Sequence, residues 1–136
     1  ESNNEKSDYF ITNIFDFKSF GYIKTDLTID NESMYLKENN INTSINIRNV
    51  KFGFDYDYES KNRIKTSEQI SIGTKINLLK DTNFIASIRK DLMSEKSIGN
   101  AMGIHYENDC LAINLDYFRD FTAVADIKNS RGFSFT

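Results

Sequence analysis

Few side chains in this sequence could carry out acid–base, nucleophilic or metal chemistry. The 136 residues include one Cys, Cys110, and one His, His105. Structural zinc sites take four Cys or His ligands, so these two residues do not make a zinc site, and we expect no cofactor. Catalysis by His105 would also need a nucleophile and an orienting acid, and the sequence spacing supplies neither. We interpret His105 as a solvated polar side chain.

Three acidic residues, Asp55, Asp57 and Asp116, fall on the polar side of alternating segments. Two carboxylates act as acid and base only in a pocket that binds substrate and raises one of their pKa values. The basic residues Lys51 and Lys75 fall on the same polar side as these acidic residues, and such a mixture of charges is typical of a hydrated surface. The sequence contains no phosphate-binding loop, nucleotide-binding fingerprint or hydrolase elbow. We therefore expect a protein that is not an enzyme.

The charge is small and evenly spread along the chain. Lys and Arg number 17 against 20 Asp and Glu, which gives a net charge of -3. Neither sign forms a run, which argues against the basic stripe of nucleic-acid-binding proteins. The uninterrupted apolar stretches are far shorter than the roughly 20 residues of a membrane helix. We expect no nucleic-acid partner and no membrane-spanning helix, although strands could still cross a membrane.

Apolar and polar residues alternate with a period of two from about residue 19 onward, which predicts strands. In one clear segment, Ile70 and Ile72 alternate with Ser71 and Gly73. The sequence predicts an all-β fold, an antiparallel up-and-down meander of about nine strands. The expected strands are 9–15, 19–30, 41–47, 50–58, 69–79, 82–89, 101–107, 110–121 and 129–136.

The connections between these strands are expected to alternate between short and long without exception. The short ones include Arg48-Asn49, Lys80-Asp81 and Asn108-Asp109. Asn and Asp suit tight hairpin turns because they tolerate positive φ. The long ones, such as 31–40 and 59–68, are polar and charged. Strict alternation would place the turns at one end of the sheet and the loops at the other, as in outer-membrane barrels.

Alternation leaves open which face of the sheet meets water, since soluble and membrane barrels produce the same stripes. Several expected strands match the roughly 9 to 11 tilted residues that cross a bilayer. Aromatic residues gather at strand ends, for example Tyr58 and Tyr106, as in interfacial girdles. We therefore expect a transmembrane barrel, with an ordinary soluble β-protein as the alternative. The expected lumen-facing residues are Asp55, Asp57, Lys75, Asn114 and Asp116, and the expected lipid-facing residues are Ile70, Ile72, Ile104, Leu111, Ile113 and Leu115.

One segment resembles a known family. Gly103 to Cys110 reads Gly-Ile-His-Tyr-Glu-Asn-Asp-Cys, and an alternating strand then leads to Arg119-Asp120-Phe121-Thr122. This run resembles the C-terminal barrel of LptD, the family of lipopolysaccharide-assembly outer-membrane proteins. The acidic loop of that family would correspond to 125–127 and its Phe-rich last strand to 130–136. The resemblance covers turn, Cys, strand and Arg-Asp-Phe-Thr over about 20 residues, and elsewhere it extends to topology more than to identities.

The resemblance implies a function and a place in the cell. The chain 1–136 would be a C-terminal fragment of an outer-membrane β-barrel domain, an arc of a larger transmembrane β-barrel in a Gram-negative bacterium. Its expected partners are lipopolysaccharide, a plug lipoprotein and periplasmic bridge proteins. Lipopolysaccharide would leave laterally beside the last strand, whose expected gate residues are Ser130, Gly132, Phe133 and Phe135. Cys110 would form a disulfide with a segment outside this chain.

Two other functions are compatible with the same pattern. A porin-like outer-membrane channel would share the alternation, and the motif around Cys110 is what weighs against it. A soluble lipid-binding β-barrel should carry a helical lid after its first strand. Residues 16–40 lack the apolar three-and-four spacing of such a lid.

Overall fold

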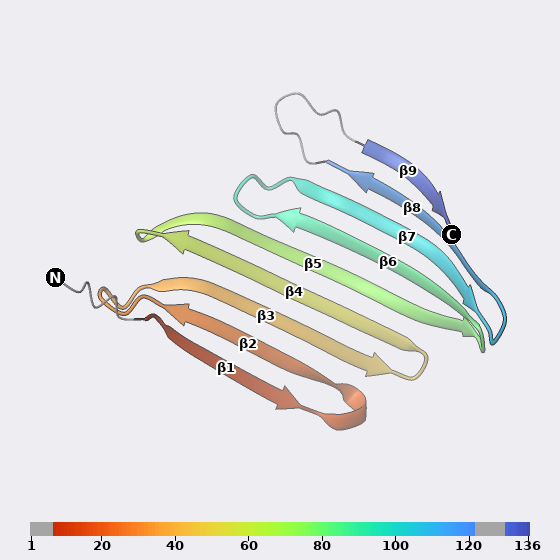
Figure 1. Ribbon diagram of the computed structural model, residues 1–136, viewed down its shortest axis with the longest axis horizontal. Helices are drawn as coiled ribbons and strands as arrows, with labels where there is room; N and C mark the ends of the chain where they lie inside the picture. Colours follow the sequence, from red (N-terminus) through yellow and green to blue (C-terminus); the bar gives the residue numbers. More distant parts are fainter. Residues whose placement is uncertain (1–6, 122–129) are drawn as a thin grey trace.

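A computed structural model describes residues 7–121 and 130–136 of the chain. These residues form one sheet of nine strands in the order β1 to β9, each antiparallel to its neighbours (Figure 1). The predicted all-β meander is confirmed. The strands are β1 Tyr9–Asp16, β2 Gly21–Ile29, β3 Leu36–Ile47, β4 Val50–Lys61, β5 Ile64–Leu79, β6 Thr82–Asp91, β7 Ser97–Glu107, β8 Ala112–Asp120 and β9 Ser130–Phe135.

A short 3-10 helix, η1 (Lys18–Phe20), joins β1 to β2. Within the described ranges, no helix has the length and apolar character needed to span a membrane.

The predicted alternation of short and long connections is wrong. β4 and β5 are joined by the two-residue turn Asn62-Arg63, whereas the sequence pattern predicts a ten-residue loop over 59–68. Both turn residues have positive φ, 52° and 65°, as a tight hairpin turn of the I′ type requires. The polar residues before and after the turn continue the backbone ladder, with Glu59 opposite Ser67. Backbone pairing therefore extends these strands beyond the point where apolar alternation stops.

Other strand boundaries also differ from the prediction. β3 begins at Leu36 and β7 at Ser97, earlier than predicted, because polar residues again pair in register. β8 begins at Ala112, later than the predicted residue 110. The Asn108 side chain explains this, since it accepts hydrogen bonds from the backbone N–H groups of Cys110 (3.0 Å) and Leu111 (2.8 Å). Cys110 and Leu111 therefore lie in the connection before the strand.

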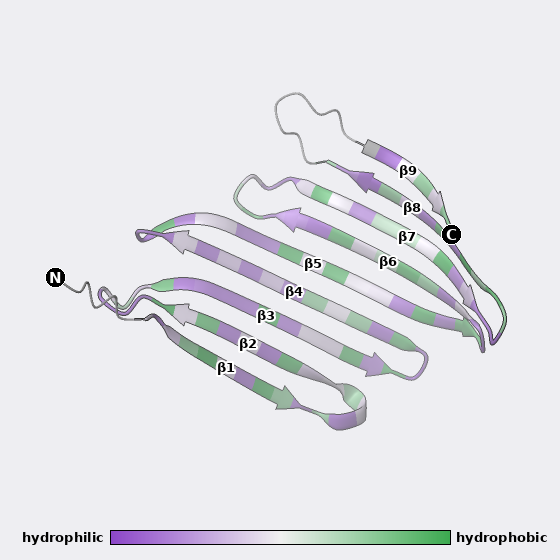
Figure 2. Ribbon diagram, viewed as in Figure 1, coloured by the Kyte–Doolittle hydropathy of each residue, from purple (hydrophilic) through white to green (hydrophobic). Residues whose placement is uncertain are grey.

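The sheet is a single layer with no covering element. No hydrophobic residue in the described part of the chain is buried, and large apolar side chains such as Ile72 and Leu115 are about half exposed, at 52% and 49%. Polar and apolar residues alternate along most strands (Figure 2). Because side chains in a strand point alternately to opposite faces, the sheet has one polar and one apolar face. Neither face packs against a second layer to form a core.

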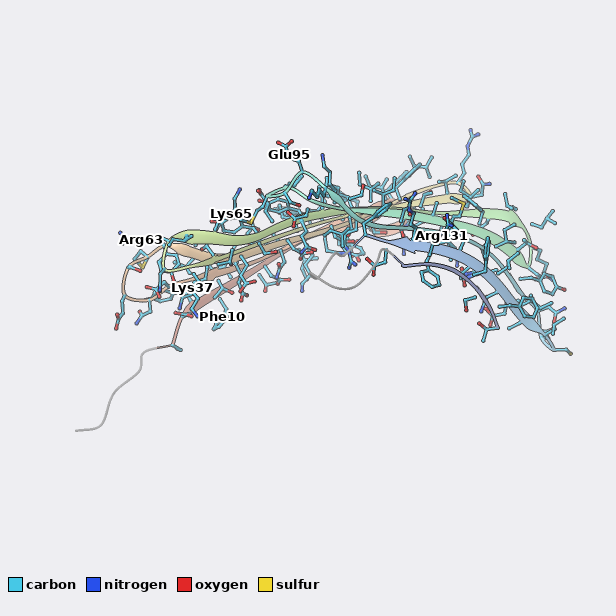
Figure 3. All side chains as sticks on the ribbon, turned by 90° about the horizontal axis from the view of Figure 1, so that it is seen from above. Phe10, Lys37, Arg63, Lys65, Glu95 and Arg131 are labelled. Atoms are coloured by element: carbon cyan, nitrogen blue, oxygen red, sulfur yellow. The ribbon has the colours of Figure 1, made fainter. Side chains whose placement is uncertain are left out.

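The sheet is curved and its strands are staggered. Seen along its edge the sheet forms an arc (Figure 3), and the ends of successive hairpins are offset from one another (Figure 1). The register also shows the stagger. Val50, the first residue of β4, pairs with Ile76, and β5 continues beyond this pair to Leu79. Curvature combined with stagger is the geometry of strands tilted around a barrel axis. The open nine-stranded sheet is thus consistent with an arc of a barrel.

Candidate functional site

The polar face of the sheet collects the residues that were predicted to face a lumen. Lys75 lies opposite Lys51, and Asp55 lies opposite Ser71 and Asn42 in the register. Asp57 follows Asp55 on the same face, and the register carries this face across β6 and β7 to Asn114 and Asp116 on β8. The structure therefore brings all five residues to one face. That this face lines a lumen stays a prediction.

Side-chain contacts on the polar face link neighbouring strands. Thr12 donates a hydrogen bond to Asp26 (2.6 Å), and Lys24 forms an ion pair with the same carboxylate at 2.6 Å. Asn42 donates to Asp55 on the adjacent strand. The Lys24 and Asp26 side chains are 42% and 36% exposed, so their ion pair contributes little to stability. These contacts order the surface while leaving it hydrated.

The polar face is hollowed in its middle. A shallow depression of about 450 Å³ carries both signs of charge and lies across five strands. Its lining residues are Lys24, Asp26, Asn40, Ile41, Asn42, Asp55, Asp57, Gln69, Ser71 and Arg89. A second depression of about 330 Å³ lies over β4 to β8. Both hollows open on the polar face.

His105 lies on the polar face beside Asp116. Its Nε2 is 2.7 Å from the Asp116 Oδ1, and both side chains are about one third exposed. Within the described residues, no hydroxyl or thiol forms a hydrogen bond with His105. The same part of the chain contains no group of three His, Cys, Asp or Glu residues placed to hold a metal ion. The pair is a cross-strand contact on a wet surface and lacks a nucleophile.

The apolar face carries most of the residues that were predicted to face lipid. Ile72 lies between Phe54 and Ile88 in the register, and Ile70 lies two residues along the same strand. Ile104 lies opposite Leu115, and Ile113 lies opposite Tyr106. Leu111 is the exception, because it lies in the connection that precedes β8. Contact of this face with lipid stays a prediction.

The apolar face ends in a polar cluster near the β4–β5 turn. The Tyr56 hydroxyl donates a hydrogen bond to Glu68 (2.8 Å), and Lys65 pairs with the same carboxylate at 2.6 Å. The Glu68 carboxylate thus has two partners, one on the adjacent strand and one on its own strand. An aromatic and charged boundary of this kind is typical of the edge of a membrane-spanning surface.

An ion-pair cluster ties the β2–β3 loop to the residue before β1. Lys37 lies 2.8 Å from an oxygen of Asp8 and 3.0 Å from an oxygen of Asp30. Hydrogen bonds from Ser33, first its hydroxyl and then its backbone N–H, lower the pKa of Asp30, and Lys37 adds to the effect. This loop is therefore held in place by groups that are charged at neutral pH.

The predicted gate residues lie on β9, one edge strand of the sheet. Gly132 lies opposite Phe118 on the polar face, and the Phe118 ring occupies the space that a side chain at Gly132 would need. Phe133 meets Tyr117 on the apolar face with ring centroids 5.1 Å apart. Phe135 lies opposite Leu115, and Ser130 begins the strand opposite Asp120. Phe118 was not predicted on the polar face, although its position directly after Tyr117 in the alternating strand is a signal that could have placed it there.

Cys110 is exposed and has a free thiol in the structure. It belongs to the connection at 108–111, at the same end of the sheet as the β3–β4 and β5–β6 turns. It lies before β8 and not within the predicted strand 110–121, because its backbone N–H donates a hydrogen bond to the Asn108 side chain, which closes the turn around it. The predicted acidic loop at 125–127 and Thr122 of the family motif lie outside the described residues.

Comparison with known proteins gives no relative, since no protein-family model matches the sequence and no curated protein matches it either.

Proposed function

We propose that the chain is part of the wall of an outer-membrane β-barrel. The observation that carries this proposal is the large uncovered apolar face of a curved, staggered sheet. In water such a face would promote aggregation, whereas in a membrane the hydrocarbon chains of the lipids would cover it. The opposite face is polar, hollowed and charged with both signs, as suits a hydrated lumen. The end of the sheet with the β2–β3 and β6–β7 loops would then face outward, together with the β4–β5 turn, and the end with the β3–β4 and β5–β6 turns would face the periplasm.

Within that class, we propose membership of a lipopolysaccharide-assembly translocon of the LptD kind. The support is the resemblance of the segment from Gly103 to Thr122, which includes the turn with Cys110 and the strand that ends in Arg119-Asp120. The protein would act without catalysis, together with a plug lipoprotein and periplasmic bridge proteins. Lipopolysaccharide would leave beside β9. The exposed outer edge and side chains of this strand, with Phe133 at 78% exposure, are compatible with a lipid path.

Depletion of the intact protein in its own cells tests this function. We expect lipopolysaccharide at the cell surface, measured by antibody labelling of unbroken cells, to fall severalfold while total cellular lipopolysaccharide falls less. A porin-like channel is the second candidate, favoured by the charged hollow on the polar face. If the protein is a porin, depletion will leave surface lipopolysaccharide unchanged and will slow the uptake of small hydrophilic solutes. That result would reject the translocon.

We expect Cys110 to be oxidised in the intact protein. The thiol is exposed at the turn end of the sheet, where a periplasmic segment could reach it, and the periplasm permits disulfides. Alkylation without reductant should leave the Cys110 peptide unlabelled in mass spectrometry, and reduction should make it reactive. Because the sequence holds no second Cys, the bond must run to a segment outside these residues. Full labelling without reductant would remove the main support for the family resemblance.

A further inference from the structure

Charged residues on the apolar face lie at one end of the sheet only. Among the described residues of β4 to β9, this face is charged near the loop ends, at Lys65, Glu68, Lys90, Arg119 and Arg131. The turn ends of the same strands carry uncharged residues on this face, such as Val50, Phe84, Ile113 and Phe135. The apolar face therefore has a cationic rim at the loop end only.

Two of these cations lie directly opposite each other without an acid between them. Arg119 on β8 is the register partner of Arg131 on β9. No ion pair within the described ranges involves either residue, whereas Glu68 is matched by Lys65. Like charges directly opposite on antiparallel strands destabilise a sheet. An anion bound between the two guanidinium groups would remove this repulsion.

The surroundings of the two arginines indicate what kind of anion fits. The Arg119 guanidinium stacks over the Phe121 ring at 4.5 Å, which holds it at the surface. On the turn side, the Tyr117 and Phe133 rings lie next to the arginines on the same face. Guanidinium groups bind phosphate with two parallel hydrogen bonds, and the rings offer apolar surface beside it. A ligand with a phosphate and hydrocarbon chains matches both features.

We propose that Arg119 and Arg131 bind the phosphorylated headgroup of a membrane lipid whose acyl chains lie along Tyr117 and Phe133. Lys90 provides a further cation on the same rim, two strands away. The inference rests on the proposed barrel, because it requires the apolar face to meet lipid. A lipid held here would also bridge β8 and β9 and so stabilise the pairing of the last two strands.

The test compares two lipids that differ only by a phosphate, dioleoylphosphatidic acid and dioleoylglycerol. The intact protein is inserted into phosphatidylcholine nanodiscs, and lipid binding is measured by native mass spectrometry. We expect phosphatidic acid to bind at least about tenfold more tightly. A hydrogen bond to a charged group contributes more free energy than the amount that corresponds to a tenfold change in affinity. The double variant R119Q/R131Q should lose this preference. Arg63→Gln, a change at the exposed β4–β5 turn, should keep it.

A second variant separates lipid binding from folding. Arg131→Glu places a carboxylate opposite Arg119, so the two strands gain an ion pair while the anion site is lost. We expect this variant to unfold at the same temperature as the wild type or above it and to bind both lipids equally. If both the double variant and Arg131→Glu keep the preference for phosphatidic acid, the lipid site is wrong and the barrel proposal stands. If the intact protein does not insert into bilayers at all, both proposals are rejected.

Discussion

Replacing Ile72 with arginine is expected to lower the free energy of unfolding of the intact, membrane-inserted protein by about 2–4 kcal/mol. Ile72 lies in the middle of the apolar face, between Phe54 and Ile88 in the register. It is 52% exposed because no protein layer covers it. If lipid covers this face, the arginine must be placed in hydrocarbon or must distort the bilayer around it. Unfolding in guanidinium from phospholipid vesicles measures the change.

The adjacent residue provides the control. Ser71 lies on the polar face between Asp55 and Arg89, so Ser71→Arg adds the same side chain to the hydrated surface. We expect this variant to change the free energy of unfolding by less than about 0.5 kcal/mol. The contrast between the two neighbours identifies the lipid face without reference to any family. Equal and small effects of both substitutions would contradict the membrane barrel.

Replacing Gly21 with alanine is expected to destabilise the intact protein by about 3 kcal/mol or more. Gly21 begins β2 with a φ of 132°, a backbone conformation that residues other than glycine rarely adopt. A Cβ added here would lie 1.8 Å from the backbone carbonyl oxygen of Ser44 on β3. Because that oxygen belongs to the backbone, relief of the clash requires β2 to move away from β3. The free energy of unfolding in vesicles again provides the measurement.

Gly53 is the matched control for this substitution. It lies in β4, which pairs with the other side of β3, and a Cβ there would come no closer than 3.9 Å to the Thr43 carbonyl oxygen. We expect Gly53→Ala to leave stability unchanged or to raise it slightly, because alanine restricts the unfolded chain. A loss of stability as large as that of Gly21→Ala would show that the effect is general to glycines in this sheet.

Period-two alternation was enough to predict the class of the fold and its two faces. In segments such as 69–79, apolar and polar residues alternate strictly, and in a strand every second side chain lies on the same face. The alternation therefore predicts both the strand and the face on which each side chain lies. For this reason the alternation alone assigns Ile72 and Asp55 to opposite faces, and the register places them there. The order of the strands followed from the short connections, which force neighbours to pair.

The lengths of the strands and the contacts between them were decided by the tertiary structure. Hydropathy gives no signal where polar residues pair through their backbones, so the pattern misses the extension of β4 to Lys61 and the turn at Asn62-Arg63. A side chain can also override the pattern, as Asn108 does when it keeps Cys110 and Leu111 out of β8. The juxtaposition of Arg119 with Arg131 depends on the register of β8 and β9. Register is a relation between two strands, and the alternation within either strand alone does not contain it.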